Sequence, residues 1–357
     1  MAGIIESSDL EAISIGSTVL GTGGGGDPYI GKLMARQALG SKQIQMLDPM
    51  EVPETAFIVP VAAFGAPVIL LEKLFNGSEA ETVFDMMERH FGQEVYATMP
   101  VEAGGLNCLI PFTVAAQKKI PVVDADGMGR AFPQLQMVTF TLFNIPASPI
   151  TQADEKGNKA IYNTIDNTWG EVLLGSTVIP MGGSCVIGCY PMIGKQLKQA
   201  AVQGVISKAK LIGESLINAK EQKLSPLHTL LNTVDGRLIF QGKVADISIR
   251  TEGRWNKGEC RIEGLNDFRG QKMRLDFQNE FLVASIDDKV IVCVPDLITM
   301  LDIDSLEPIT VETIQYGYRV SVIAMPCDEK WRTVSGLELA GPKAFGYDYD
   351  YIQMEHV

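Results

Sequence analysis

Three acidic residues stand beside glycine-rich stretches in the first half of the chain, where carboxylates could do acid–base chemistry. Asp124 and Asp126 lie two residues apart in VVDADGMG, so both would point to the same side at the end of a strand. Glu102 stands just before a glycine pair in VEAGGLN. Carboxylates at the carboxyl end of a strand are where an α/β sheet commonly builds its ligand crevice. We predict that Asp124, Asp126 and Glu102 are catalytic, with one aspartate as the base that deprotonates a water molecule.

A run of four glycines in GTGGGGDP, residues 21–28, is the second feature that could serve a ligand. Glycine adopts positive φ at little cost, and its bare backbone lets a ligand come close. Asp27 would cap the following helix and Pro28 would take its first position, so amide N–H groups would point at an oxygen-rich or anionic group. The alternative is a tight turn between helices. The residues predicted to bind ligand here are Gly23, Gly24, Gly25, Gly26 and Asp27.

The same stretch imitates a dinucleotide-binding motif. A G-x-G-x-x-G pattern is formed by Gly21, Gly23 and Gly26, and Asp48 ends an apolar run about twenty residues later. That motif requires a strand before the glycines. The preceding residues, SSDLEAISIGSTVLG, instead open with a capping-box pattern and continue with mostly helical apolar spacing. We therefore expect helix, glycine loop and helix, and no nucleotide cofactor.

Four further polar residues are candidates for ligand binding. Asn107 follows the VEAGG glycines and would orient a ring, and Arg130 in DGMGRAF would bind a carboxylate tail or pair with the two aspartates. In the second half, Asn279 and Glu280 interrupt the apolar alternation of a β-rich run. Because ligand sites favour domain interfaces, we expect Asn279 and Glu280 to reach back to the first domain. The alternative for this pair is a bulge or exposed turn at the rim of a barrel.

Metal-binding patterns are weak in this sequence. The six cysteines are scattered and are expected as free thiols, and the three histidines are far apart. Cys185 and Cys189 are close enough in GGSCVIGCYP for a redox or metal pair, or for two small apolar residues packed beside glycines. A divalent metal held by Asp124, Asp126 and Glu102 stays open, without support from any His or Cys partner.

The elements that must position these residues change character along the chain. Up to about residue 166, apolar runs such as TAFIVPVAAFG alternate with amphipathic runs such as SEAETVFDMMERHFG, which predicts an α/β domain. A long helix is expected over about residues 195–222, followed by short β-rich runs typical of an antiparallel sheet or barrel. The first domain is expected over residues 1–167 and the second over residues 168–357.

Composition narrows the class of partner. The chain has 357 residues, 46% of them hydrophobic, and a formal net charge of −13 without a Lys/Arg-rich run. A nucleic acid or anionic membrane is therefore an improbable partner, and a small-molecule substrate is expected. The N-terminus has neither a positive region nor a long apolar stretch, so we expect a cytoplasmic protein. A homo-oligomer is compatible with this composition.

Taken in order along the chain, these stretches resemble the S-methyl thiohydantoin desulfurase family, which is associated with hydantoinase- and oxoprolinase-type proteins. The resemblance lies in GTGGGGDPYIGK, VEAGGLN and VDADGMGRAFPQLQM, and then in FQGKVADI, FQNEFLVA, VPDLI, YGYRVSVIAMP and GPKAFGYD. It implies a three-layer α/β domain followed by a β-barrel-like domain. It also implies a hydrolase that replaces the C2 sulfur substituent of a thiohydantoin-like ring with oxygen. The alternative is a non-catalytic ligand-binding partner of a hydantoinase or oxoprolinase. The residue assignments above come from this sequence and not from the family.

Overall fold

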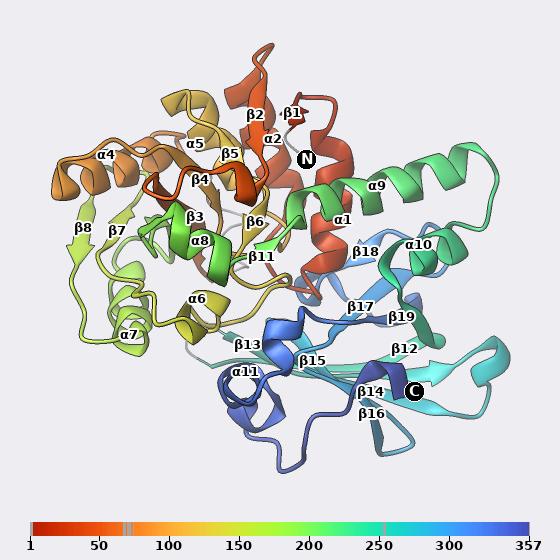
Figure 1. Cartoon of the computed structure of the whole chain (residues 1–357). Coiled ribbons are helices and arrows are strands. Elements are labelled where there is room, and N and C mark those ends of the chain that lie inside the picture. Colours follow the sequence, from red (N-terminus) through yellow and green to blue (C-terminus); the bar gives the residue numbers. More distant parts are fainter. Residues whose placement is uncertain (1–2, 67–68, 70–72, 74, 253–254, 357) are drawn as a thin grey trace.

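The structure is a computed structural model that describes the chain except for residues 1–2, 67–68, 70–72, 74, 253–254 and 357 (Figure 1). Its described residues form a mixed sheet surrounded by helices and, beside it, an antiparallel sheet (Figure 1). This confirms the predicted α/β domain followed by a β domain.

The first sheet has a parallel centre and antiparallel margins. Its strand order is β1-β2-β5-β4-β3-β9-β7-β8, and β10 pairs with β3. Strands β2, β5, β4 and β3 run parallel to one another. The bounds are β1 (Gly3–Ile5), β2 (Ile44–Leu47), β3 (Phe57–Gly65), β4 (Ala97–Pro100), β5 (Val122–Val123), β7 (Ile150–Ala153), β8 (Lys159–Tyr162), β9 (Ser184–Gly188) and β10 (Met192–Ile193). Since β9 and β10 follow residue 167, this sheet takes strands from both sides of the expected domain boundary.

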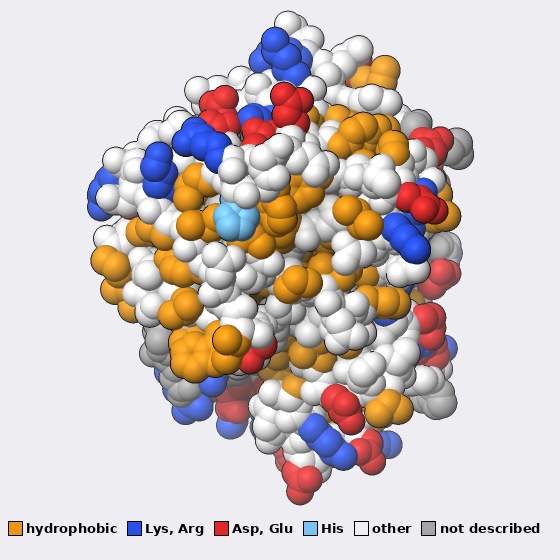
Figure 2. Space-filling view, turned by 60° about the vertical axis from the view of Figure 1, so that its left-hand side comes forward, with side chains coloured by type: hydrophobic (Ala, Val, Ile, Leu, Met, Phe, Trp, Pro, Cys, Tyr) orange, Lys and Arg blue, Asp and Glu red, His pale blue; other side chains and the backbone are white. Residues whose placement is uncertain are grey.

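The surface of the first domain carries apolar as well as charged side chains. Seen from that side, hydrophobic side chains gather across the middle of the face, and many charged side chains lie toward its edge (Figure 2). Scattered exposed apolar side chains are normal on globular proteins. Among the helices that the structure describes, none has the length and apolar character needed to cross a bilayer.

Alternating side chains of β3 separate two helical layers. Phe57, Val59, Val61 and Ala63 pack in one core cluster with residues of α4 (Glu79–Phe91) and α5 (Ile110–Lys118). Ile58, Ala62 and Phe64 belong to a second cluster that contains residues of α7 (Asn167–Val178) and α8 (Gly194–Ala200). The period of two along a strand therefore buries both faces of the sheet, which gives three layers.

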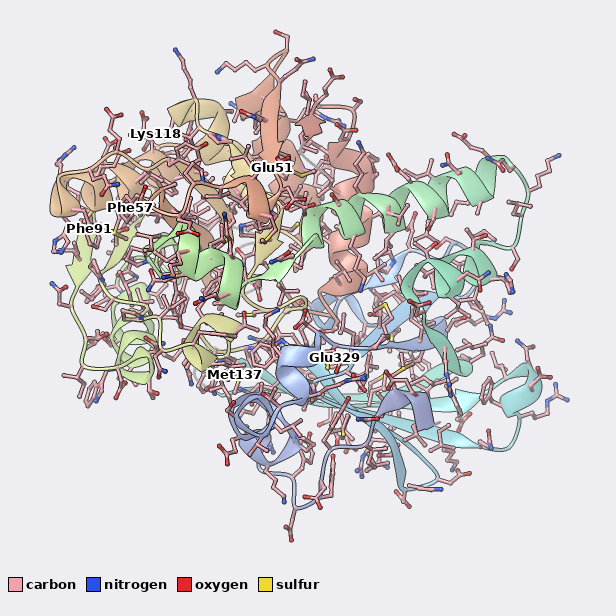
Figure 3. The ribbon with its side chains drawn as sticks, in the orientation of Figure 1. Glu51, Phe57, Phe91, Lys118, Met137 and Glu329 are labelled. Carbon is pink, nitrogen blue, oxygen red and sulfur yellow. The ribbon has the colours of Figure 1, made fainter. Side chains whose placement is uncertain are left out.

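Ring and ion-pair contacts attach α4 to its neighbours. Phe91 at the end of α4 packs against Phe57 at the start of β3, with the ring centroids 5.0 Å apart (Figure 3). Lys118 at the end of α5 donates hydrogen bonds to Asp85 and Glu88 of α4 at 2.8 and 2.7 Å (Figure 3). These contacts hold α4 against the start of β3 and against α5.

The glycine run connects two helices, as predicted. It separates α1 (Leu10–Leu20) from α2 (Pro28–Leu39). The Asp27 carboxylate accepts a hydrogen bond from the Tyr29 N–H at 2.7 Å, so Asp27 is the N-cap and Pro28 is the first helical residue. A helix rather than a strand precedes the glycines, which removes the structural context that a dinucleotide-binding motif needs.

The single long helix expected over residues 195–222 is wrong. The chain instead forms α8, the short strand β11 (Val202–Gln203) and then α9 (Val205–Glu221). Strand β11 pairs with β6 (Ala125–Asp126), and Gly204 has a φ of 76°. Helical apolar spacing continues across the break, but strand pairing and one left-handed residue interrupt the helix, so tertiary contacts override the local pattern.

The second sheet is antiparallel throughout its pairs. Its order is β16-β15-β14-β13-β12-β19-β17-β18. The bounds are β12 (Arg237–Glu252), β13 (Trp255–Gly264), β14 (Lys272–Gln278), β15 (Glu280–Ile286), β16 (Lys289–Cys293), β17 (Leu297–Asp302), β18 (Pro308–Ile309) and β19 (Arg319–Met325). The remaining α-helices of the described chain are α6 (Thr139–Leu142), α10 (Pro226–Val234) and α11 (Val334–Ala340).

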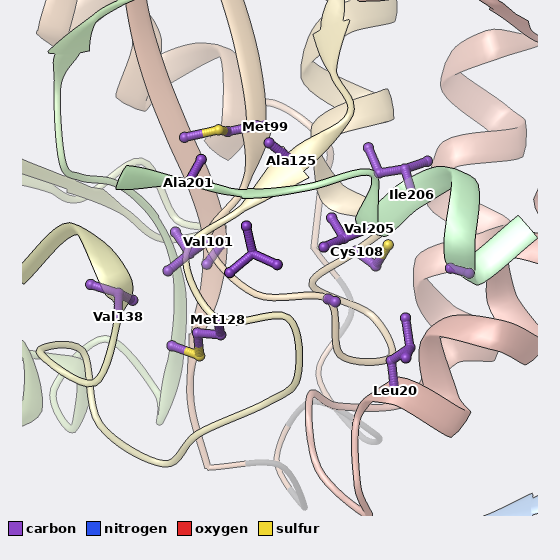
Figure 4. Close-up of a cluster of buried hydrophobic side chains, with 14 of the residues drawn as sticks. Leu20, Met99, Val101, Cys108, Ala125, Met128, Val138, Ala201, Val205 and Ile206 are labelled. Atoms are coloured by element: carbon purple, nitrogen blue, oxygen red, sulfur yellow. The ribbon is translucent and has the colours of Figure 1, made fainter. Parts of the chain in front are cut away.

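Two glycines let α1 and α9 approach each other closely. A Cβ atom added to Gly213 of α9 would overlap the backbone of Ala12, and one added to Gly16 of α1 would overlap the backbone of Ala209. The beginning of α9 also enters the core that contains Leu20, Met99 and Val205 (Figure 4). Close packing of these helices therefore holds the glycine loop, which follows α1, against the sheet.

We predict that Gly213→Ala destabilises the protein although alanine favours helix. The overlap with a carbonyl group should lower the free energy of unfolding by about 1–3 kcal/mol, the usual cost of overpacking. Urea unfolding measures it. Asn218→Ala, at an exposed position of the same helix, is the control and should be neutral or stabilising. A more stable Gly213→Ala protein would contradict the close helix contact.

Candidate active site

A pocket that is partly open to solvent lies at the carboxyl ends of β3 and β4. Its walls come from the end of β3, the segment after β4, Met128 and residues 132–135, Ile187 of β9, the glycine loop and the turn between β14 and β15. Carboxyl ends of parallel strands are the usual ligand position in α/β sheets. The second domain contributes Asn279 and Glu280 to the same pocket.

Glu102 is one of two carboxyl groups in this pocket. It is only 7% exposed, and its Oε1 accepts a hydrogen bond from the Asn107 side chain at 2.5 Å. The Asn107 amide oxygen in turn accepts one from the Ala63 N–H at 2.8 Å, so β3 fixes the amide. Burial raises the pKa of Glu102 to about 7, although the bonds from Asn107 and the Phe132 backbone oppose the shift. Near neutral pH, Glu102 can therefore both accept and release a proton.

Glu280 is the second carboxyl group, and it is more strongly desolvated. Its side chain is 3% exposed, and Oε2 has no hydrogen-bond partner within the described part of the chain. Burial raises the pKa of Glu280 well above its usual value, and the nearby charge of Glu102 raises it further. Arg130 opposes this shift through its charge. Burial and the charge of Glu102 therefore favour the protonated form of Glu280, whereas the pKa of Glu102 lies near neutral pH.

A tight reversal in the second sheet brings Glu280 to the pocket. Strands β14 and β15 turn at Asn279, which has a φ of 60°. The Asn279 side-chain oxygen accepts a hydrogen bond from the Asn256 backbone N–H at 2.9 Å, and the Asn279 backbone N–H donates to the Asn256 carbonyl at 2.8 Å. The Phe281 N–H then donates to the Thr22 carbonyl at 2.8 Å. The polar interruption in FQNEF is thus a buried turn that joins β15 to the first domain. Asn279 and Glu280 therefore lie against the first domain, as we expected from the sequence.

The glycine loop has different tasks along its length. Positive φ occurs at Gly23 (90°), Gly25 (83°) and Gly26 (80°). A Cβ at Gly23 would lie 2.7 Å from the Phe281 ring, whereas one at Gly25 would overlap Gly104. Gly25 and Gly26 line the pocket. Gly24 does not have positive φ; it lacks a side chain because the Glu280 carboxyl group occupies that space. The loop therefore combines close backbone packing with a pocket wall.

Asp27 and Asp124 cap the starts of helices and do not line the pocket. Asp27 caps α2 and lines a neighbouring hollow together with Thr310 and Glu312. The Asp124 carboxylate accepts hydrogen bonds from the N–H groups of Ile206 at 2.8 Å and Ser207 at 3.0 Å, and from the Ser207 hydroxyl. These are donors of the first turn of α9, which explains why a carboxylate follows β5. Asp124 is not among the residues that line the pocket.

Asp126 supports the loop that forms the pocket wall. It is fully buried, and its Oδ1 accepts hydrogen bonds from the N–H groups of Met128 at 3.1 Å and Gly129 at 2.8 Å. Burial raises the pKa of Asp126 well above its usual value. Met128 lines the pocket but Asp126 does not. Of the three acids predicted to be catalytic, the structure places Glu102 alone in the pocket wall.

Arg130 is buried with every donor engaged. A guanidinium group has five N–H donors. Nε donates to the Ala131 carbonyl at 3.0 Å, and Nη1 donates to the carbonyls of Pro295 and Asp296 at 2.9 and 2.8 Å. Nη2 donates to the Thr22 hydroxyl at 3.0 Å and the Phe281 carbonyl at 3.2 Å. Arg130 therefore has no donor left for the carboxylate tail that we expected it to bind, and it pairs with backbone instead of Asp124 or Asp126.

The described residues contain no group of three or more His, Cys, Asp or Glu side chains placed to hold a metal ion. All six cysteines are buried and free. Cys185 instead accepts a hydrogen bond from the Gln152 side chain at 3.1 Å. Acid–base chemistry by carboxyl groups is thus what this pocket offers from its own side chains.

Apolar wall residues were not predicted from the sequence. Phe64 at the end of β3, together with Phe132 and Leu135, lines the pocket. Their sequence signal is only their position, because Phe64 ends a buried strand that points at the crevice. Apolar walls with a few polar groups are typical of small-molecule sites.

Comparison with known proteins agrees with this architecture. The model of the S-Me-THD-like N-terminal domain matches residues 8–164, and that of the S-Me-THD-like C-terminal domain matches residues 165–354. The chain therefore belongs to the S-methyl thiohydantoin desulfurase-like family, whose name indicates a thiohydantoin-related role. No curated protein matches. A crystal structure of a protein from Chromobacterium violaceum is similar, with a TM-score of 0.77 and 22% identity over 99% of this chain and 100% of that one. That likeness shows the fold.

We predict that Asp124→Ala lowers stability without changing the pocket. Loss of the helix cap should reduce the free energy of unfolding by about 1–2 kcal/mol in urea titrations. Asp267→Ala, at an exposed position, is the control and should change it by less than about 0.5 kcal/mol. A stable Asp124→Ala protein that has lost ligand binding would instead place Asp124 in the site.

Proposed function

We propose that the protein is a hydrolase that replaces the C2 sulfur substituent of a thiohydantoin-like ring with oxygen. Family membership supports a thiohydantoin-related role. The observation that carries the reaction type is the pair Glu102 and Glu280, two carboxyl groups with different proton affinities in one desolvated pocket. Such a pair supplies a base and an acid at the same pH.

The reaction needs one water molecule and no redox partner. Ionised Glu102 takes a proton from the water molecule while the oxygen of that water bonds to ring carbon C2. The C2–S bond then breaks, and protonated Glu280 gives its proton to the departing sulfur. The proton that remains on the C2 oxygen passes to the neighbouring ring nitrogen, so the products are a ring with a C2 carbonyl and a free thiol. Glu102 is left protonated and Glu280 ionised, and transfer of one proton through solvent restores the starting state. Thiolates are good leaving groups, so proton donation by Glu280 needs to assist the departure of sulfur only modestly.

The surrounding residues hold the two acids and the ring. Asn107 fixes the Glu102 carboxylate through its hydrogen bond and is itself held by β3. Phe64 and Phe132 supply apolar walls for a flat ring. The backbone of Gly25 and Gly26 would meet a ring oxygen, and main-chain N–H groups there would stabilise negative charge that develops in the transition state. Asp124 and Asp126 serve this arrangement indirectly, through α9 and the Met128 loop.

The direct test is an assay of the purified chain alone. Hydantoins, 2-thiohydantoins and S-methyl thiohydantoins are supplied separately, and thiol release is followed with a chromogenic disulfide. Thiol release from an S-substituted ring supports the proposal. Ring binding without release would favour a non-catalytic partner of a hydantoinase or oxoprolinase. If the protein shows no binding of any ring and no thiol release, a thiohydantoin-related role would be rejected.

We predict that Glu102→Gln and Glu280→Gln each lower kcat by at least ~100-fold, the scale of lost acid–base catalysis. In the unchanged protein, kcat/KM should rise about tenfold per pH unit below the Glu102 pKa of about 7 and level off above it, because the base must be ionised. Glu263→Gln is the control, since Glu263 is a glutamate at an exposed position of β13 outside the pocket. It should keep the profile. A profile flat between pH 5 and 8 would remove Glu102 as the base.

We also predict that Glu280→Gln stabilises the protein in alkali. A carboxyl group with a raised pKa binds its proton more tightly in the folded state, so stability falls as pH rises from its unfolded toward its folded pKa. Glutamine removes this loss. The melting temperature of Glu280→Gln should therefore match or exceed that of the unchanged protein at pH 8, and the difference should shrink toward pH 5. A lower value at both pH values would make Glu280 a structural residue.

A further inference from the structure

Asp296, which directly precedes β17, is a buried acid that the proposed reaction does not use. Its side chain is fully buried. Oδ1 accepts hydrogen bonds from the Cys327 N–H at 3.0 Å and from Nη2 of Arg332 at 3.1 Å. Oδ2 accepts them from the Tyr351 hydroxyl at 2.7 Å and from the Met354 N–H at 2.9 Å. The carboxylate therefore ties the C-terminal segment, which carries Tyr351 and Met354, to the start of β17.

The main chain of the same residue holds Arg130. The Asp296 carbonyl accepts a hydrogen bond from Nη1 of Arg130 at 2.8 Å, and the Pro295 carbonyl accepts another at 2.9 Å. Nη2 donates to the Phe281 carbonyl at 3.2 Å, one residue after Glu280. One guanidinium group thus connects Asp296 to the part of the chain that places Glu280 in the pocket.

Charge connects these groups as well. Burial lowers the pKa of Arg130 to about 10, and the charges of Glu280 and Asp296 are among those that oppose this shift. Burial raises the pKa of Glu280, the charges of Glu102 and Glu312 add to the rise, and Arg130 opposes it. With an anion at Asp296, the guanidinium has a counterion other than Glu280, so Glu280 need not ionise to balance it.

We infer that Asp296 is a positioning residue that keeps Glu280 able to donate a proton, because it holds Arg130 in place and balances its charge. Its main-chain carbonyl fixes the guanidinium, and its carboxylate, held by the C-terminal segment, supplies the counterion. Without that anion, ionised Glu280 would be the group that best stabilises the buried guanidinium. The role of Glu280 as the acid rests on the proposed function, whereas its protonation can be measured without any substrate.

The test follows protonation of Glu280 by infrared spectroscopy between pH 6 and pH 10. In each background the spectrum of the Glu280→Gln variant is subtracted, so the carbonyl stretch of protonated Glu280 remains. We expect the pH at which half of this band is lost to fall by at least ~0.5 pH unit in Asp296→Asn. An unchanged midpoint in folded Asp296→Asn would overturn the inference.

Asp154→Asn is the matched control. Asp154 is 2% exposed, and its carboxylate accepts hydrogen bonds from the N–H groups of Lys156 and Asn158. Within the described chain it neither lines the pocket nor accepts a hydrogen bond from Arg130. This variant should lose stability and keep the midpoint. An equal fall in both variants would overturn the specific role of Asp296.

Arg332→Gln tests the charge with the opposite sign. Arg332 pairs with Asp296 at 3.1 Å and with Glu355 at 2.6 Å. Removal of this cation leaves the Asp296 charge less compensated, so the midpoint of the Glu280 band should rise. This variant decides the question if Asp296→Asn does not fold, and a midpoint that falls or stays unchanged would overturn the inference.

Activity separates this inference from the proposed function. With an S-methyl thiohydantoin as substrate, kcat/KM should decline at the alkaline pH where Glu280 loses its proton, and this decline should move to lower pH in Asp296→Asn by the same amount as the band. A shifted band in a protein that releases no thiol would support the role of Asp296 and count against the proposed function.

Discussion

The buried guanidinium of Arg130 is the interaction on which the site depends. A buried charge is tolerated when its donors are satisfied, and all five donors of Arg130 bond to protein oxygens. Thr22 and Ala131 belong to the first domain, whereas Phe281, Pro295 and Asp296 belong to the second. One side chain thus fixes the start of β15 against the glycine loop. The position of Glu280 in the pocket follows from this junction.

The pocket stores electrostatic free energy that a purely structural cavity would avoid. Glu280 keeps an oxygen without a protein partner, and the proximity of Glu102 makes ionisation of both acids unfavourable. Natural proteins place such unfavourable groups at functional sites and compensate elsewhere. Here the hydrogen bonds of Arg130 to Thr22 and Phe281 hold the chain on both sides of Glu280 in place. The acids can therefore remain poorly solvated without unfolding the interface between the domains.

Local chemistry explains which parts of the structure the sequence predicted. The capping residues Asp27 and Pro28 specify the start of α2, so the helix, glycine loop and helix could be recognised without tertiary information. The polar interruption at Asn279 predicted a special position, because a regular strand has no use for it. The position of Glu102 beside a glycine pair is a local signal of the same kind.

Other features depend on contacts that are distant in sequence. Asp124 follows a strand, which is a position where catalytic acids occur. Its carboxylate instead caps α9, a helix that begins about eighty residues later in the chain. The break between α8 and α9 depends on pairing with β6. Arg130 has the side chain of an anion binder, and only the carbonyls of the second domain show that its donors are occupied. In each case the residue type was informative and its partner was not visible locally.

The central claim is that Glu280 holds a proton at neutral pH beside a titrating Glu102. Infrared difference spectroscopy of the unchanged protein against Glu280→Gln tests it most directly, because a protonated carboxyl group has a carbonyl stretch that an ionised one lacks. We predict that the difference spectrum at pH 7 shows the loss of one such band in Glu280→Gln, while bands that the two proteins share cancel. A difference spectrum with carboxylate bands alone would show Glu280 ionised and would contradict the account.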